Sequence, residues 1–164
     1  MTATAETQAR VHFRPAGPDD TADILALIRE LAEYEKLAHE VKATETGLRK
    51  NLFGRRARAE VLLAYAGGSL AGFCLFFHNF STFLGKPGLY IEDLYVRPIY
   101  RGQGVGRQFF AELARIALER GCGRIEWWVL DWNRPAIGFY RRLGARPMND
   151  WTVYRLDEAA MRRL

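Results

Sequence analysis

The 164-residue sequence contains only two cysteines, Cys74 and Cys122. They form neither a disulfide framework nor the paired spacing of a metal site, so we expect a reducing compartment and no bound metal ion. Long apolar runs are missing too, since residues 70–77 are apolar but too few to cross a bilayer. Residues 1–10 are polar and lack the apolar core of a signal peptide. We therefore predict a cytoplasmic protein that has no membrane partner.

A concentrated basic patch is also lacking, although the formal net charge is +5. A positive charge raises the question of nucleic-acid binding. The basic residues are scattered, however, and their densest group, residues 55–58, is short and falls in a predicted loop. A solvated loop explains this group, so no nucleic-acid partner is expected. There are no repeats and no internal linker, which predicts a single domain over residues 11–164 after a disordered tail at residues 1–10.

The order of helical and strand patterns predicts an α/β fold with a mixed sheet. The segment at residues 89–96 is apolar on both faces, which is typical of a central strand. Gly67-Gly68 predicts a hairpin turn, and Thr44 and Asn133 predict helix N-caps. The expected strands cover residues 11–14, 59–66, 69–78, 89–96, 124–130 and 151–156, and the expected helices cover residues 18–39, 44–54, 103–120, 133–144 and a short C-terminal segment.

The most informative segment reads Arg-Gly-Gln-Gly-Val-Gly at residues 101–106, between an apolar strand and a long helix. Glycines let the backbone approach a ligand closely, and a helix N-terminus favours negative charge, so a phosphate or pyrophosphate is the expected guest. The segment lacks the ending of a P-loop, and its glycine spacing does not fit the dinucleotide fingerprint. A helix-start turn without a ligand is the alternative.

Residues around this loop indicate its ligand. Leu94-Tyr95-Val96, Arg101-x-x-Gly104-x-Gly106, Asn133 and Phe139-Tyr140 occur in this order, which resembles the GCN5-related N-acetyltransferase (GNAT) family. Residues 31–35, 90–96, 100–104, 129–133 and 139–145 resemble its diamine acetyltransferase branch, which contains spermidine/spermine N1-acetyltransferases and thialysine N-acetyltransferases. The resemblance runs from Val11 onward. It implies the GNAT fold, a mixed central β-sheet with a splayed strand pair, flanked by helices.

The resemblance implies acetyl-CoA as the cofactor. The pantetheine arm would pair with the edge of a bulged, splayed strand near Leu94, and the pyrophosphate would lie on the backbone N–H groups of the glycine loop. The implied cofactor-binding residues are Leu94, Tyr95, Val96, Arg101, Gly102, Gln103, Gly104, Val105, Gly106, Arg107, Asn133, Tyr140 and Arg142.

Acetyl transfer to an amine needs a base for the amine, a donor for the thioester oxygen and an acid for the departing thiolate. The resemblance implies Glu92 as the base acting through water, the backbone N–H of Leu94 as the donor and Tyr140 as the acid. An ordinary strand-end carboxylate and a core aromatic beside Phe139 are the alternatives for the two side chains. Glu92 and Asp93 are neighbours on a strand, so we expect them to point to opposite faces.

Acidic and aromatic residues would recognise a cationic acceptor. The residues implied by the branch are Tyr34, Glu35, Glu92, Asp93, Glu126 and Trp128. At most one of Trp127 and Trp128 is expected to contact the acceptor, because one side of their strand is core. The expected acceptor is a small molecule with a primary amine near a second charge, such as a diamine, a polyamine or thialysine.

Three other functions stay open at this point. They are acetylation of a protein N-terminus or lysine, a non-catalytic CoA-binding regulator, and a basic nucleic-acid-binding module. The branch also implies a homodimer.

Overall fold

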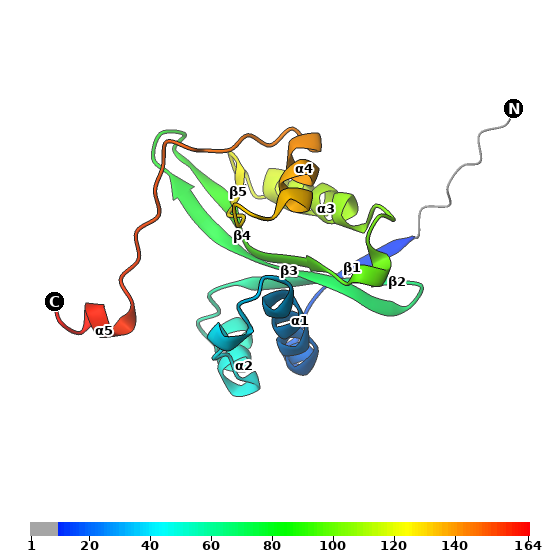
Figure 1. Cartoon of the computed structure of the whole chain (residues 1–164), viewed down its shortest axis with the longest axis horizontal. Helices are drawn as coiled ribbons and strands as arrows, with labels where there is room; N and C mark the ends of the chain where they lie inside the picture. Colours follow the sequence, from blue (N-terminus) through cyan, green and yellow to red (C-terminus); the bar gives the residue numbers. More distant parts are fainter. Residues whose placement is uncertain (1–9) are drawn as a thin grey trace, which may run out of the picture. The chain divides into compact units, whose positions relative to one another are not determined.

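The computed structural model describes residues 10–164, so the predicted tail lies, apart from Arg10, outside the described residues. The chain divides into two compact units, residues 1–128 and residues 129–164, and each is described by itself. The first unit contains β1 (Val11–Pro15), α1 (Thr21–Tyr34), α2 (Glu45–Phe53), β2 (Glu60–Ala66), β3 (Ser69–Ser81), β4 (Lys86–Val96), α3 (Val105–Glu119) and β5 (Ile125–Trp127), with short 3₁₀ turns at Pro18–Asp20, Ala38–Glu40 and Pro98–Tyr100, and the second contains α4 (Arg134–Arg142) and α5 (Glu158–Met161) (Figure 1).

The five strands of the first unit form one sheet in the order β1-β2-β3-β4-β5. The first four strands pair antiparallel, and β4 pairs parallel with β5, so the predicted mixed sheet is confirmed. The β2–β3 turn contains Gly67 and Gly68 with φ of 57° and 81°. Such positive φ values are costly for side chains with a Cβ, which explains why the turn uses glycines.

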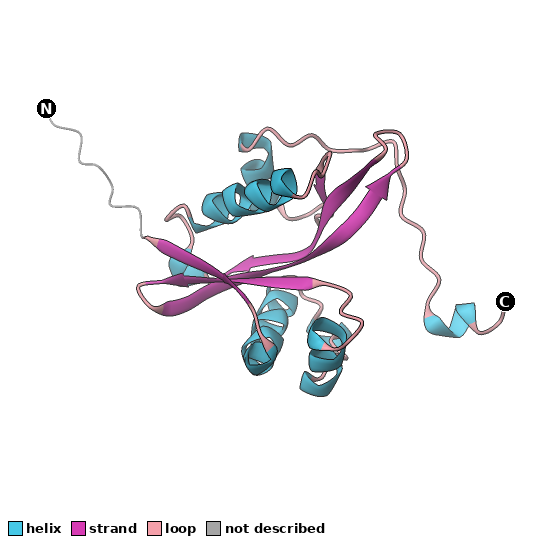
Figure 2. Ribbon diagram, turned by 180° about the vertical axis from the view of Figure 1, so that it is seen from behind, coloured by secondary structure: helices cyan, strands magenta, loops and turns pink. Residues whose placement is uncertain are grey.

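Helices cover both faces of the sheet, α1 and α2 on one and α3 on the other (Figures 1 and 2). On the first face, Ile24 and Leu27 of α1 belong to one buried cluster with Leu63 and Phe73. Their spacing puts one stripe of the helix against the sheet. Burial removes this apolar surface from water, at roughly 1.5–3 kcal/mol for each large side chain.

On the second face, α3 buries Phe109 and Leu113 against Leu62 and Leu89 of the sheet. The strands therefore present apolar side chains on both sides, which is why β4 reads as a nearly continuous apolar segment. This packing fixes the N-terminus of α3 beside the end of β4.

Local signals in the sequence set most helix boundaries. The Thr44 side chain accepts a hydrogen bond from the Gly47 N–H at 3.1 Å, and the Asn133 side chain accepts one from the Ala136 N–H at 3.3 Å. Both predicted N-caps are therefore confirmed. Helix α1 ends at Tyr34, and Lys36 just beyond it adopts a left-handed φ of 61°.

Two predicted strands differ in the structure. β5 covers only Ile125–Trp127 instead of residues 124–130. The strand expected at residues 151–156 is wrong, because this segment is without a ladder partner among the described residues. Its alternating apolar side chains gave a strand pattern, but a strand also needs a neighbouring strand for its backbone hydrogen bonds. None of the helices in residues 10–164 has the length and apolar character needed to cross a membrane.

Candidate active site

A bulge interrupts the pairing of β4 at Glu92. Leu75 of β3 pairs with Asp93 and Phe76 pairs with Ile91, so Glu92 is the extra residue. Ile91 and Leu94 both pack against the α3 side of the sheet. In a regular strand, residues three apart would face opposite sides, so the bulge breaks the alternation. The expectation that Glu92 and Asp93 follow strict alternation is therefore wrong at this position.

The bulge is followed by a strand edge that β5 does not pair with. β4 pairs with β5 only from Leu89 to Ile91, so residues 92–96 extend past the end of β5. The Arg97 N–H donates to the carbonyl of Ala71 on β3 at 2.8 Å. Backbone groups alternate in direction along an antiparallel strand, which turns the N–H groups of Leu94 and Val96 away from β3. These donors therefore face the side that β5 leaves open.

The glycine loop joins this strand end to α3. Gly102 has φ of 73°, and Gly104, the N-cap residue of α3, has φ of 80°. Within the described chain, the first turn of α3 holds no acidic residue, and its N-cap has no side chain to bind the helix N–H groups. Free N–H groups at the positive end of a helix form a ready anion site. The loop therefore fits a pyrophosphate, and the neighbouring strand edge fits an extended amide-containing arm.

The Arg101 side chain lies along β4. Its Nε donates to the Val96 carbonyl oxygen at 2.7 Å. Its guanidinium carbon lies 4.8 Å from the centre of the Tyr34 ring and 5.4 Å from the centre of the Tyr95 ring. Arg101, a predicted cofactor residue, thus contacts both the predicted acceptor residue Tyr34 and the predicted cofactor residue Tyr95.

Carboxylates gather at the bulge on the side of the sheet that α1 covers. Glu35, which follows the last residue of α1, and Glu92 both act electrostatically on Asp93. Burial is the main cause that raises the pKa of Asp93 to about 6, and the charges of Glu92 and Glu35 add to the effect. Burial also raises the pKa of Glu35. Like charges held together in partly buried positions create a strong preference for a cation.

The outer part of this face carries aromatic rings. Trp128 is 60% exposed and stands edge-on to Tyr90 at 6.0 Å between ring centres. Trp127 instead packs edge-on against Phe110 of α3 at 5.0 Å. The sequence argument that only one of the two tryptophans avoids the core is confirmed. Trp128 is therefore the one that is available to an acceptor.

Glu126 has partners of its own. It forms an ion pair with Arg124 at 2.8 Å, and the Asn79 side-chain amide donates to it at 3.4 Å. A carboxylate that is already neutralised attracts a further cation less strongly. Among the predicted acceptor residues, Glu35, Glu92 and Asp93 therefore carry most of the free negative charge.

Tyr90 was missed by the sequence argument. Burial, with a smaller contribution from the charges of Glu92 and Glu126, raises the pKa of Tyr90 to about 12. Its phenol thus stays protonated beside these carboxylates and can donate a hydrogen bond. The register pairs it with Glu126 across β4 and β5, a relation that no spacing in the sequence reveals.

The other predicted residues belong to the second unit. Asn133 caps α4, Tyr140 contacts the neighbouring Phe139 ring at 5.6 Å between centres, and Arg142 ends the helix. A basic residue in the last turn compensates the negative end of the helix dipole, which gives Arg142 a structural role of its own.

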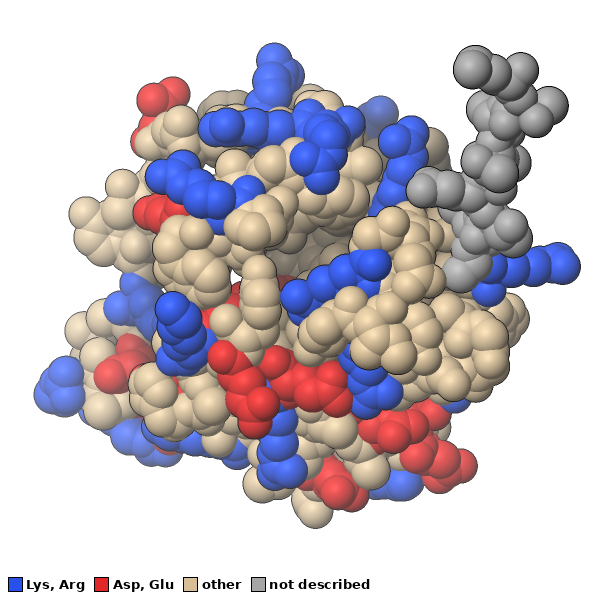
Figure 3. Space-filling view, turned by 45° about the vertical axis from the view of Figure 1, so that its right-hand side comes forward, with Lys and Arg blue, Asp and Glu red and all other residues tan. Residues whose placement is uncertain are grey.

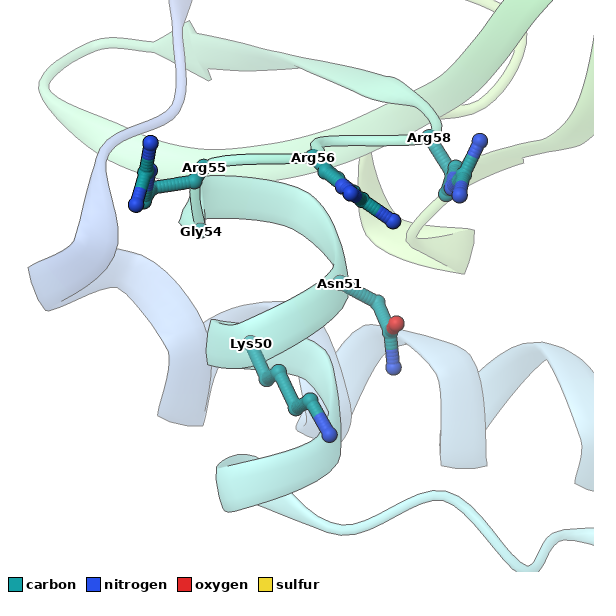
Figure 4. Close-up of a pocket in the computed structure, with 6 residues that line it drawn as sticks. All are labelled: Lys50, Asn51, Gly54, Arg55, Arg56 and Arg58. Carbon is teal, nitrogen blue, oxygen red and sulfur yellow. The ribbon is translucent and has the colours of Figure 1, made fainter.

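The basic group at residues 55–58 lies elsewhere in the first unit. It lines a cavity of about 510 Å³ together with Lys50, Asn51 and Gly54, on the connection between α2 and β2 (Figure 4). Every lining residue is exposed, as predicted for a solvated loop. Figure 3 shows acidic and basic side chains mixed over one face of the molecule, without an unbroken basic stripe. The face drawn in Figure 3 therefore gives no support to a nucleic-acid interface.

Comparison with known proteins identifies the class to which this site belongs. The profile of the acetyltransferase (GNAT) family matches residues 24–145. Thialysine N-epsilon-acetyltransferase of Sus scrofa is 41% identical over 95% of this chain and 98% of its own length. L-ornithine N5-acetyltransferase of Arabidopsis thaliana is 32% identical over 93% of this chain and 86% of its own length. An integron cassette protein of V. cholerae has the same fold, with a TM-score of 0.78 at 24% identity over 93% of this chain and 96% of that chain.

The chain belongs to the GNAT family. It is therefore an N-acetyltransferase, and the resemblance to the thialysine and diamine branch that its motifs indicated is confirmed.

The raised pKa of Asp93 predicts a pH-dependent stability. Asp93 has a pKa of about 6 in the folded chain, against an ordinary aspartate value of 3.8. The folded state therefore holds this proton more tightly, so its stabilising contribution is complete below the unfolded pKa and is lost as pH rises through the folded pKa. The difference corresponds to at most about 3 kcal/mol.

We expect Asp93→Asn, which cannot ionise, to exceed the wild type in free energy of unfolding at pH 8 and to approach it at pH 4. Urea unfolding at both pH values measures this difference. Asp150→Asn, at an exposed turn, is the matched control and should change neither value. A wild type as stable as Asp93→Asn at pH 8 would contradict the expectation.

Proposed function

We propose that the protein transfers the acetyl group of acetyl-CoA to a primary amine of a small acceptor that carries a second positive charge. The observation that carries this proposal is the gathering of Glu35, Glu92 and Asp93 beside the open edge of β4. The curated relatives act on thialysine and L-ornithine, as their names state. Both compounds carry two amino groups, which supports the same class of acceptor here.

The residues would divide the reaction as follows. Acetyl-CoA supplies an acetyl group activated as a thioester. The first-turn N–H groups of α3 would hold its pyrophosphate, and the Leu94 N–H would donate to the carbonyl oxygen of the acetyl group. Glu92 would accept the amine proton through water, while Glu35 and Asp93 bind the second positive charge. Tyr140 would return a proton to the sulfur, since a phenol and a thiol have pKa values of about 10 and about 8.5.

A thiol-release assay tests this proposal. Acetyl-CoA is offered with thialysine, ornithine, spermidine, 1,3-diaminopropane and n-propylamine. The last two differ by one terminal amine, so their ratio isolates the second charge. We expect kcat/KM for the diamine to exceed that for n-propylamine by about tenfold or more, equivalent to roughly 1.4 kcal/mol. Equal values, or a lysine-containing peptide as the better substrate, would contradict the proposal and favour protein acetylation.

Replacing the proposed base should change the pH profile. In Glu92→Gln the amine must lose its proton to solvent, so we expect kcat/KM near pH 7 to fall about 10²- to 10⁴-fold and the profile to move to higher pH. Asp93→Asn is the matched variant, because it removes the neighbouring carboxylate and should raise the KM of the amine without moving the rising, acidic limb of the pH profile. If Asp93→Asn moves the profile and Glu92→Gln does not, the base is Asp93.

We also propose a homodimer. Residues 151–156 are extended, and Trp151, Val153, Tyr154 and Leu156 are all more than half exposed, at 75%, 54%, 93% and 58%. Large exposed apolar groups of this kind mark interaction surfaces. A second copy would bury them. Light scattering should give twice the chain mass of 18.8 kDa, and Trp151→Ser/Leu156→Ser should give the monomer mass. A monomeric wild type would refute this assembly.

We further propose that the protein is a single catalytic domain and that it is located in the cytoplasm. The family match spans both compact units, which supports one domain over residues 11–164. Both cysteines are free thiols, which supports a reducing compartment. Imaging of a fluorescent fusion protein tests the location.

A further inference from the structure

Arg101 is the first residue of the glycine loop, yet its side chain contacts neighbouring elements. Its Nε donates to the Val96 carbonyl oxygen at 2.7 Å, beside the end of β4. The guanidinium lies over the rings of Tyr95 on β4 and of Tyr34, the last residue of α1, at 5.4 Å and 4.8 Å. One planar cation therefore joins the loop, the strand and the helix.

A second arginine from the same connection supports this arrangement. Arg97 binds the Glu30 carboxylate through two nitrogens at 3.1 Å and 2.8 Å and donates to the Leu70 carbonyl at 3.0 Å. Glu30 and Tyr34 are four residues apart, so they occupy the same side of α1. The segment between β4 and α3 therefore holds the C-terminal half of α1 at two successive turns.

The residue that follows Tyr34 is Glu35, whose charge acts on Asp93 at the bulge. Lys36, directly after it, adopts a left-handed φ of 61°, so the chain turns sharply there. The position of Glu35 thus depends on how the end of α1 is held, and Arg101 supplies one of the contacts at this end.

We propose that Arg101 is a positioning residue that fixes Glu35 against β4 and thereby links the pyrophosphate loop to acceptor binding. The inference rests on the proposed function, because it assumes that Glu35 binds the acceptor's second charge. It assigns Arg101 to the acceptor half of the reaction, although its backbone belongs to the cofactor loop.

The geometry requires arginine at this position. A guanidinium can stack on aromatic faces while its Nε–H donates in its own plane. A lysine ammonium keeps the charge but cannot stack on both rings and reach the Val96 carbonyl together. A phosphate contact, in contrast, needs chiefly the positive charge, which lysine also supplies. Arg101→Lys therefore separates the two roles.

The test compares Arg101→Lys and Arg101→Gln with the wild type in the full chain. The KM of thialysine and the Kd of coenzyme A are measured, with calorimetric binding of thialysine in parallel. We expect both variants to raise the amine KM and Kd about tenfold and to change the Kd of coenzyme A by less than about threefold. A raised coenzyme A Kd in Arg101→Gln that Arg101→Lys restores, with unchanged amine binding, would overturn the proposal in favour of a phosphate ligand.

Tyr34→Leu completes a double-mutant cycle with Arg101→Gln. If Arg101 acts through Tyr34, the double variant should bind thialysine no more weakly than the weaker single variant. If the two substitutions raise the Kd of thialysine by independent factors that multiply in the double variant, the link through Tyr34 would be overturned. Thermal melting of each variant checks that it is folded. If Arg101→Gln is unstable, Arg101→Lys replaces it in the cycle with Tyr34→Leu. If the wild-type protein binds thialysine without acetylating it, the proposed function is refuted, but the effect of the Arg101 variants on thialysine binding can still be measured. If the wild-type protein does not bind the amine, both proposals are overturned.

Discussion

Gly104→Val is expected to abolish useful cofactor binding, raising the Kd of coenzyme A about 100-fold or more. Gly104 is the N-cap of α3 and has φ of 80°, a conformation that a β-branched residue rarely adopts. Valine would pull the backbone out of this conformation and turn the first-turn N–H groups away from the pyrophosphate. Losing one or two hydrogen bonds to a charged group corresponds to roughly 3 kcal/mol or more, which is about 100-fold in Kd.

Gly121→Val is the matched control for this prediction. Gly121 follows the other end of α3, has φ of 70° and has open space around the position of a Cβ. The substitution should strain the backbone by a similar amount, about 1–2 kcal/mol, without touching the loop. Calorimetric titration with coenzyme A and thermal melting of both variants separate binding from stability. Coenzyme A binding by Gly104→Val within about threefold of the Gly121→Val value would refute the pyrophosphate assignment.

Tyr140→Phe is expected to lower kcat by about 10²- to 10⁴-fold while leaving coenzyme A affinity near that of the wild type. The substitution removes only the phenol oxygen, so the contact of the ring with Phe139 at 5.6 Å is preserved. What is lost is the proposed proton donor to the sulfur. Steady-state kinetics with a saturating diamine measures kcat, and titration with coenzyme A measures affinity.

Two comparisons sharpen this prediction. Tyr154→Phe removes only a phenol oxygen from the same unit and keeps the ring that the proposed dimer would bury, so it should leave kcat unchanged. A thiolate whose thiol has a lower pKa departs more easily without a proton donor. With an acetyl thioester of such a thiol, the loss of kcat in Tyr140→Phe should therefore be smaller than with acetyl-CoA. A defect that is equally large with both thioesters would assign Tyr140 a structural role beside Phe139.

The strand patterns of β1 to β4, the caps and the glycine turns could be predicted because each is a local pattern of residues that are neighbours in the sequence. Thr44 and Asn133 bind N–H groups three residues away, and Gly67 and Gly68 supply the positive φ values of their own turn. The prediction failed at residues 151–156, where the strand pattern was present without a partner strand. A strand depends on a distant segment, and its own sequence does not specify one.

In the candidate site, too, the locally encoded features could be predicted and those that depend on distant segments could not. The loop that suits a pyrophosphate was evident from Gly104 and its setting, and the family resemblance supplied Glu92 and Tyr140. The bulge was expected only through that resemblance, and strict alternation led to the wrong orientation for Glu92 and Asp93. The closeness of Glu35 to Asp93 could not be read from spacing, because α1 reaches β4 only through packing.

The sequence by itself therefore determined the class of fold, since periodicity, caps and glycine conformations are local properties. Its motifs indicated the family, and they predicted the glycine turn as the site of the pyrophosphate. Only the tertiary structure decided which charges meet. It brought Glu35, Glu92 and Asp93 together, left the N–H groups of Leu94 and Val96 beyond the end of β5, and placed the Arg101 guanidinium over the rings of Tyr34 and Tyr95. These features depend on contacts between segments that are far apart along the chain, and the burial of α1 against the sheet brings those segments together.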